Sequence, residues 1–151
     1  MKVEKFKIIQ FIRELIIMID KYMDNFPKKD IELKNRIRMN SYDILELAYE
    51  ANIATDVEYK KRLLLKMLAK IKIVDFLLNM SYDKHIITEK KYYKFGNKMD
   101  DIVKYTTGWI NQLKLQKNKR VWLNVACQSV CQQQQQHNER KLRWQREQQQ
   151  L

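Results

Sequence analysis

The hydrophobic positions of this chain recur at helical spacing in four blocks separated by short polar stretches. In the first block, about residues 3 to 23, Ile8, Ile12, Leu15 and Ile19 fall on one stripe. Residues three and four positions apart share one face of an α-helix, so each block predicts an amphipathic helix. The other blocks predict helices over about residues 28 to 52, 56 to 80 and 89 to 115.

Special residues mark where these helices begin. Pro27 suits the first turn of the second helix, where its missing N–H is not needed. Thr55 followed by Glu58 forms a capping-box pattern, in which each side chain satisfies the other residue's free backbone N–H. Thr88 is the candidate N-cap of the fourth helix. The loops are therefore only a handful of residues long.

Short loops join helices that lie side by side and antiparallel. The chain has only 2 Gly and 1 Pro in 151 residues, too few for the turns of a sheet protein. The predicted fold class is therefore all-α, an up-down-up-down four-helix bundle over residues 1–115. Beyond that the periodicity fails and glutamine dominates, so residues 116–151 are expected to be a basic, Gln-rich, disordered tail.

The third and fourth helices are apolar over more of their circumference than one bundle core requires. Surplus apolar surface of this kind favours self-association, although thick packing within one bundle explains it nearly as well. The candidate subunit-contact residues are Leu65, Ile73, Tyr105 and Trp109.

Charge adds a second expectation. The 30 basic and 18 acidic residues give a net charge of +12, which favours a polyanionic partner. In the third helix Arg62, Lys66 and Lys70 stand four residues apart, and basic side chains in line neutralise successive phosphates. The candidate nucleic-acid-binding residues form three patches: Lys60, Lys61, Arg62, Lys66 and Lys70; Lys34, Arg36 and Arg38; and Lys90, Lys94 and Lys98.

Alternatives stand beside this interpretation. A solvated helix face is the better explanation for one isolated stripe, whereas three patches on one small chain make nucleic-acid contact equally good. Tyr42, Tyr59, Tyr92 and Tyr93 lie near these charges and fit base stacking, but capping of the core is favoured for them. A membrane-surface protein ranks third, because the basic faces lack a one-sided Lys-and-Trp pattern.

The sequence does not indicate an enzyme. Gly96 and Gly108 are isolated and form no phosphate-cradling loop, and no nucleophile has an evident triad partner. Asp43, Glu46 and Glu50 share roughly one face of the second helix, as carboxylates do in metal-binding bundles, but no Glu-x-x-His element accompanies them. We expect these acids to pair with Lys or Arg of a neighbouring helix or subunit, and we predict no metal, cofactor or catalytic residue.

The most apolar stretch near the beginning is interrupted by Arg13 and Glu14 and is shorter than the roughly 20 residues of a membrane span. No signal-like segment precedes it. The expected location is therefore the cytoplasm, without a membrane partner.

Two segments carry a resemblance to a known family. Residues 25–52, "NFPKKDIELKNRIRMNSYDILELAYEAN", resemble the junction of the first two helices in the accessory variability determinant (Avd) proteins of diversity-generating retroelements. Residues 106–114, "TTGWINQLK", resemble the Gly-Trp segment that closes that family's last helix. These motifs are partly shared with the 23S rRNA intervening-sequence four-helix proteins, so the resemblance identifies the superfamily better than the subfamily.

The resemblance implies a basic four-helix protomer that assembles into a pentamer and binds a reverse transcriptase together with RNA or cDNA. It also implies a role in copying a template repeat into a variable gene. Family members tend to use arginine on their basic faces, whereas this chain uses mostly lysine, which gives point charges in place of bidentate forks. A helical scaffold that binds only protein is the alternative function.

The glutamines of the tail fit the same family. A run of CAA codons read one base later becomes AAC, which encodes asparagine, and template repeats of such retroelements are rich in AAC. We therefore expect the tail, from about Val121 onward, to be translated from template-repeat DNA in a shifted frame. An ordinary Gln-rich tail is the alternative.

Overall fold

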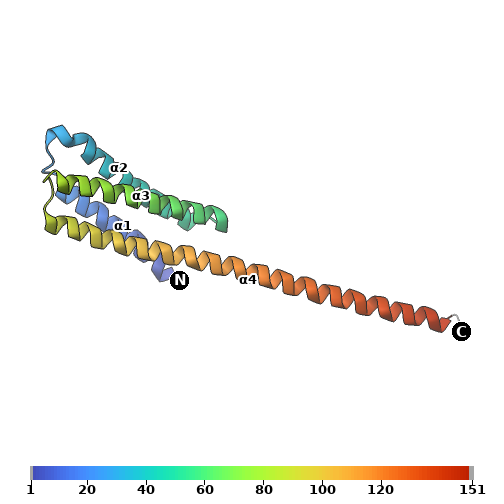
Figure 1. The fold of residues 1–151 in the computed structure, drawn as a ribbon. Helices are drawn as coiled ribbons and strands as arrows, with labels where there is room; N and C mark the ends of the chain where they lie inside the picture. Colours follow the sequence, from blue (N-terminus) through green and yellow to red (C-terminus); the bar gives the residue numbers. More distant parts are fainter. Residues whose placement is uncertain (1, 150–151) are drawn as a thin grey trace. The chain divides into compact units, whose positions relative to one another are not determined.

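A computed structural model describes residues 2–149, and all its regular elements over that range are helical (Figure 1). The chain begins with α1 (Lys2–Tyr22), followed by a short 3-10 helix, η1 (Lys28–Asp30). Three longer helices follow: α2 (Ile31–Ile53), α3 (Val57–Asp83) and α4 (Glu89–Gln149). The chain divides into two compact units, Met1–Leu113 and Lys114–Leu151. The all-α prediction and its four-helix, bundle-like character are confirmed.

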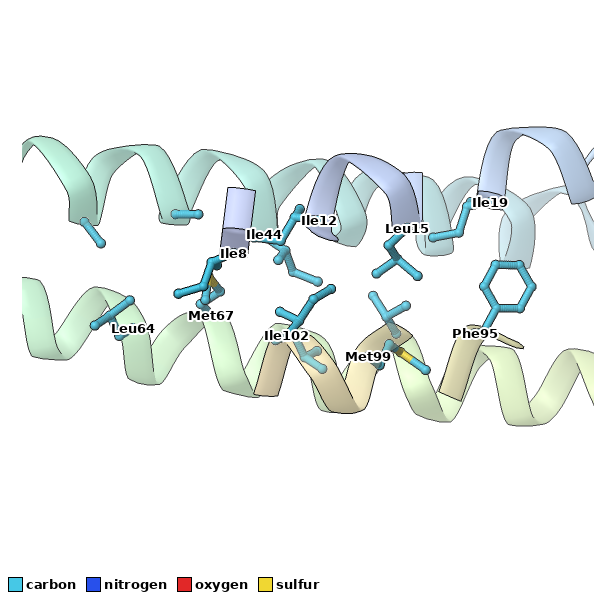
Figure 2. Close-up of a cluster of buried hydrophobic side chains, with 14 of the residues drawn as sticks. Ile8, Ile12, Leu15, Ile19, Ile44, Leu64, Met67, Phe95, Met99 and Ile102 are labelled. Carbon is cyan, nitrogen blue, oxygen red and sulfur yellow. The ribbon is translucent and has the colours of Figure 1, made fainter. Parts of the chain in front are cut away.

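The hydrophobic stripes meet in one core within the first unit. Ile8, Ile12, Leu15 and Ile19 of α1 are each at most 1% exposed. Figure 2 shows these side chains pointing toward residues of the other helices, among them Phe95 on α4. Burying such side chains contributes on the order of 2 kcal/mol each. The helical periodicity of the sequence therefore identified the core-facing positions correctly.

Aromatic contacts show that α1 and the first part of α4 run antiparallel. The ring centroids of Phe11 and Tyr105 are 5.4 Å apart, and those of Tyr22 and Phe95 are 5.7 Å apart. As residue numbers rise along α1, the contacted numbers fall along α4. Asp43 and Lys70, with Glu50 and Tyr59, relate α2 to α3 in the same antiparallel sense.

Two helix starts test the capping predictions. The N-cap of α3 is Asp56, whose carboxylate accepts a hydrogen bond of 2.7 Å from the backbone N–H of Tyr59. The predicted capping box of Thr55 and Glu58 is therefore wrong by one residue, because α3 begins one position later and the carboxylate of Asp56 accepts the free N–H. At α4 the hydroxyl of Thr88 accepts from the N–H of Lys91 at 3.4 Å, as predicted.

The end of α3 is a Schellman motif. The N–H of His85 donates to the carbonyl of Tyr82, and the N–H of Ile86 donates to the carbonyl of Ser81, both at 2.9 Å. This arrangement requires a left-handed residue after the helix, and His85 adopts it with φ of 59°. Glycine usually occupies that position because it has no Cβ to clash. The turn directs the chain back toward α4.

The two loops at this end of the first unit are tied together (Figure 1). The Nζ atom of Lys84 lies 2.6 Å from Oδ1 of Asp30, although the residues are 54 positions apart in sequence. The Asp30 side chain is 8% exposed, so its carboxylate relies on this ammonium group in place of water.

The C-terminal segment differs from our expectation. We expected the fourth helix to end near residue 115 and residues 116–151 to be disordered, whereas α4 is helical through Gln149. Glutamine, arginine, lysine and leucine have high helix propensity, and no Gly or Pro follows Gly108 to end the helix. The described side chains from Lys117 to Arg146 are exposed. Residues 150 and 151 lie outside the described part.

Candidate nucleic-acid interface

The predicted basic stripe of α3 lies beside acidic residues of α2. The Nζ atom of Lys70 is 3.0 Å from Oδ2 of Asp43 and 3.2 Å from Oδ1 of Asn40. In the sequence no acid lies between Glu58 and Asp75, the segment that contains the stripe. Packing of α2 against α3 nevertheless places acids beside the stripe that are 20 to 30 positions away along the chain. The expectation that an acid of the second helix pairs with a neighbouring helix is confirmed for Asp43.

A groove of about 340 Å³ lies between α2 and α3. Its lining combines apolar side chains with charged side chains of both signs. Leu47, Ala69 and Ile73 form the apolar part, and Asp43, Glu46, Glu50, Lys66 and Lys70 form the charged part. A surface of this kind holds cations and anions close together, so it is less cationic than the α3 sequence alone indicates.

The other members of the α3 patch are placed differently from one another. Arg62 is exposed, with its guanidinium carbon 5.9 Å from the centroid of the Tyr59 ring, while Lys60 and Lys61 are partly buried. The Tyr59 hydroxyl donates a hydrogen bond to Oε1 of Glu50, and this bond raises the pKa of Tyr59. Arg62 and Lys66 are therefore the most accessible cations of this patch.

The basic patch of α2 is largely engaged with neighbouring side chains. Arg36 Nε lies 3.3 Å from Glu32 one turn earlier, with both side chains well exposed. Arg38 Nε lies 3.2 Å from Asp20 of α1, and its Nη2 donates to the Tyr42 hydroxyl at 3.4 Å. That hydrogen bond, with the nearby carboxylates, raises the pKa of Arg38. Lys34, the third predicted residue of this patch, is partly buried.

The patch of α4 separates into two parts. Lys98 donates to Oε2 of Glu14 at 2.5 Å, lies 5.0 Å above the Phe11 ring and is 21% exposed. This hydrogen bond links α4 to α1, and it lowers the pKa of Glu14. Lys90 and Lys94 are exposed. Among the described side chains, neither of these two lysines forms a salt bridge with an acid.

The predicted subunit-contact residues also differ in their surroundings. Leu65 and Ile73 of α3 are 48% and 44% exposed, so both present apolar surface to solvent. Tyr105 is partly buried against Phe11, and Trp109 is 6% exposed in the core of its own chain. Trp109 lies on the same α4 face as the core residue Ile102, seven positions earlier, which explains its burial. The structure leaves Leu65 and Ile73 as the accessible pair.

The core-capping interpretation favoured for the tyrosines is correct for Tyr92 and wrong for Tyr93. The rings of Tyr82 and Tyr92 stack, and Tyr93 beside them is 61% exposed. Tyr92 packs against the core, as the favoured interpretation expected, whereas Tyr93 presents most of its surface to solvent. The sequence did contain a signal for this difference. Tyr92 and Tyr93 are adjacent, and neighbours in a helix point about 100° apart, so the two rings do not face the core equally.

Other site classes have little support among the described residues. No group of three or more His, Cys, Asp or Glu side chains comes together there as a metal site would require. No helix in that part of the chain is long and apolar enough to cross a membrane. Comparison of the sequence with protein-family models and with curated proteins finds no significant match.

Proposed function

We propose that this chain is a non-catalytic accessory protein of a diversity-generating retroelement. In this proposal it binds the element's reverse transcriptase and its RNA or cDNA through a basic oligomeric surface during mutagenic copying. The observation that carries the proposal is the Avd-like character of residues 25–52 and 106–114 in a basic, all-helical chain. An up-down-up-down helix order belongs to the proposal, and the antiparallel pairs α1–α4 and α2–α3 support it.

The charge distribution supports an electrostatic mode of nucleic-acid binding. Arg62, Lys66, Lys90 and Lys94 are exposed, and among the described side chains none of them forms a salt bridge with an acid. Cations of this kind release condensed counterions when they contact phosphates, and that release drives binding at low salt. The proposal sets the protein in the cytoplasm, where it meets the retroelement RNA.

Assembly into a homo-oligomer is part of the proposal, with a pentamer as the state that the family resemblance implies. The exposed apolar residues Leu65 and Ile73 support a subunit contact on α3. Light scattering of the full chain at micromolar concentration measures the mass. A pentamer mass is expected, and a monomer mass contradicts this part of the proposal.

The binding test is a titration of structured RNA over a range of salt concentrations. The logarithm of the binding constant is expected to fall steeply and linearly with the logarithm of the salt concentration. Joint replacement of Arg62, Lys66 and Lys70 by glutamine is expected to flatten that slope. An unchanged slope removes α3 from the interface, and absence of binding by the wild-type chain contradicts the proposed function.

A second candidate is a helical scaffold that binds only protein. The groove between α2 and α3, with the exposed apolar residues Leu65, Ile73 and Phe76 on α3, favours it. A pull-down of the reverse transcriptase after nuclease treatment separates the two candidates. Retention of the polymerase without any affinity for RNA would favour the scaffold.

A further inference from the structure

Three tyrosine rings from two helices gather beside the α3–α4 loop. Tyr82 of α3 and Tyr92 of α4 stack with centroids 5.2 Å apart and planes inclined by 15°. The Tyr92 hydroxyl accepts a hydrogen bond of 3.0 Å from Nδ2 of Asn79. The centroid of Tyr93 lies 6.4 Å from that of Tyr92. The inner two rings are held by packing and by a hydrogen bond, so they form a fixed support for the third.

The ring of Tyr93 does not pack against the hydrophobic core. Tyr82 and Tyr92 pack against the buried cluster, whereas Tyr93 is 61% exposed. An aromatic ring left in water at a fixed support retains apolar surface that a ligand can cover. Tyr93 is therefore the member of the cluster that is able to bind a flat partner.

The helix leaves space next to this ring. Side chains of an α-helix lean toward its N-terminus, so a side chain at position 96 would cover the turn that carries Tyr92 and Tyr93. Position 96 is glycine, and a Cβ atom built there meets nothing within 4 Å. The space at position 96, on the C-terminal side of the tyrosine pair, is consequently open.

The local charge is positive. Residues 83–94 contain four lysines against two acids, Asp83 and Glu89. Tyr93 and Lys94 stand three and four positions after Lys90, so both neighbour it on one face of α4, and both lysines are exposed. Lys91 lies 4.8 Å above the Tyr22 ring and faces α1 instead. Lys90 and Lys94 are thus the exposed cations on the helix face that carries Tyr93.

We propose that Tyr93, with Lys90 and Lys94, forms a stacking site for an unpaired base of single-stranded nucleic acid. The ring supplies a face for the base, and the two ammonium groups supply contacts for the adjoining phosphates. A duplex hides its base faces, so this site selects single strands. The inference rests on the proposed nucleic-acid function and specifies which strand form is recognised and where.

The experiment uses the full chain with two fluorescent probes, an oligouridylate of about 20 nucleotides and a mixed-sequence duplex of about the same length. The variant Tyr93→Ala is expected to weaken binding of the oligouridylate about ten-fold or more, the effect of losing one base stack. Tyr93→Phe keeps the ring and is expected to bind like the wild type. Tyr49→Ala, which removes a tyrosine 43% exposed on α2, is the matched control.

Two further variants separate stacking from charge. Lys94→Gln is expected to lower the salt slope by about 0.7, the value of one phosphate contact on a single strand, whereas Tyr93→Ala leaves the slope unchanged. Gly96→Leu, which covers the open flank, is expected to weaken binding of the oligouridylate, while Gly96→Ala has a smaller effect. Duplex affinity is expected to be unchanged by Tyr93→Ala.

The outcomes distinguish this inference from the proposed function. If the wild-type chain binds the oligouridylate and Tyr93→Ala binds it equally well, the stacking site is overturned and the nucleic-acid function stands. Equal loss of single-strand and duplex binding in Tyr93→Ala also overturns it, because a stacking site acts on unpaired bases. If the wild-type chain binds neither probe, the proposed function itself fails.

Discussion

The Nζ atom of Lys70 lies 3.0 Å from Oδ2 of Asp43, and this ion pair joins α3 to α2 at the C-terminal end of the predicted phosphate-binding stripe. The side chains are 36% and 38% exposed, so solvent screens the pair and its contribution to stability is small. Its larger consequence is for binding, because a cation already paired with a carboxylate releases fewer counterions from a bound phosphate.

The two lysines of the stripe are therefore expected to differ. Lys66→Gln should lower the salt slope of RNA binding by about 0.7 to 0.9, the value of one phosphate contact. Lys70→Gln should lower it by less than half as much. The two variants are matched in chemistry and in helix, so their slopes compare directly. Equal slopes would show that Asp43 does not shield Lys70.

The ion pair of Lys84 with Asp30 is expected to stabilise the fold. Lys84→Met leaves the nearly buried carboxylate of Asp30 without its donor, at a cost of about 1 to 3 kcal/mol in the free energy of unfolding by urea. Asp30→Asn should lower the free energy of unfolding less in the Lys84→Met variant than in the wild type, because the ion pair is already absent there.

The pair of Arg36 and Glu32, with side chains 69% and 79% exposed, provides the control for this prediction. Arg36→Met should change the free energy of unfolding by no more than about 0.5 kcal/mol. If Lys84→Met lowered the free energy of unfolding no more than Arg36→Met does, the ion pair between the two loops would have no stabilising role.

The left-handed conformation of His85 offers a stabilising substitution. Its φ of 59° crowds a Cβ atom, so His85→Gly should raise the free energy of unfolding by about 1 kcal/mol. His85→Ala keeps the Cβ atom and should give no such gain. A loss of stability in the glycine variant would indicate that the imidazole makes a compensating contact.

The hydrogen bond from Lys98 to Glu14 predicts a pH dependence. Because the folded-state pKa of Glu14 is lowered from 4.5, its contribution to stability is present above that value and is lost as the pH falls through the folded-state pKa. Glu14→Gln should cost about 0.5 to 1 kcal/mol at neutral pH, and the difference from the wild type should vanish in acid. A difference that persisted at low pH would assign the effect to packing.

The Gln-rich segment predicts a property of its gene. The glutamine codons should be mainly CAA, and the frame shifted by one base should read as asparagine-rich. A second copy of the same DNA should occur nearby with differences at adenines, close to a reverse transcriptase gene. Predominantly CAG codons, or the absence of a second copy, would contradict template-repeat origin.

Removal of residues 116–151 should leave the unfolding of the first unit unchanged.

The sequence alone determined the helices of the first unit and their buried faces. A period of 3.6 residues is a local property, so Ile8, Ile12, Leu15 and Ile19 identified a core face without knowledge of any partner helix. The N-cap at Thr88 was likewise readable, since it depends only on groups three residues apart. The continuation of α4 beyond Leu115 was missed because low-complexity composition was weighed above the helix propensity of its residues.

Only the tertiary structure decided which charges meet. The rotation of α2 and α3 about their axes follows from packing of the whole core, and it sets Asp43 against Lys70 while leaving Lys66 exposed. The stacking of Tyr82 on Tyr92 depends on the same long-range packing and on the turn at His85. Charge and ring patterns along one helix therefore specify candidates for a site, and the neighbouring helices determine which of those side chains remain accessible to a partner.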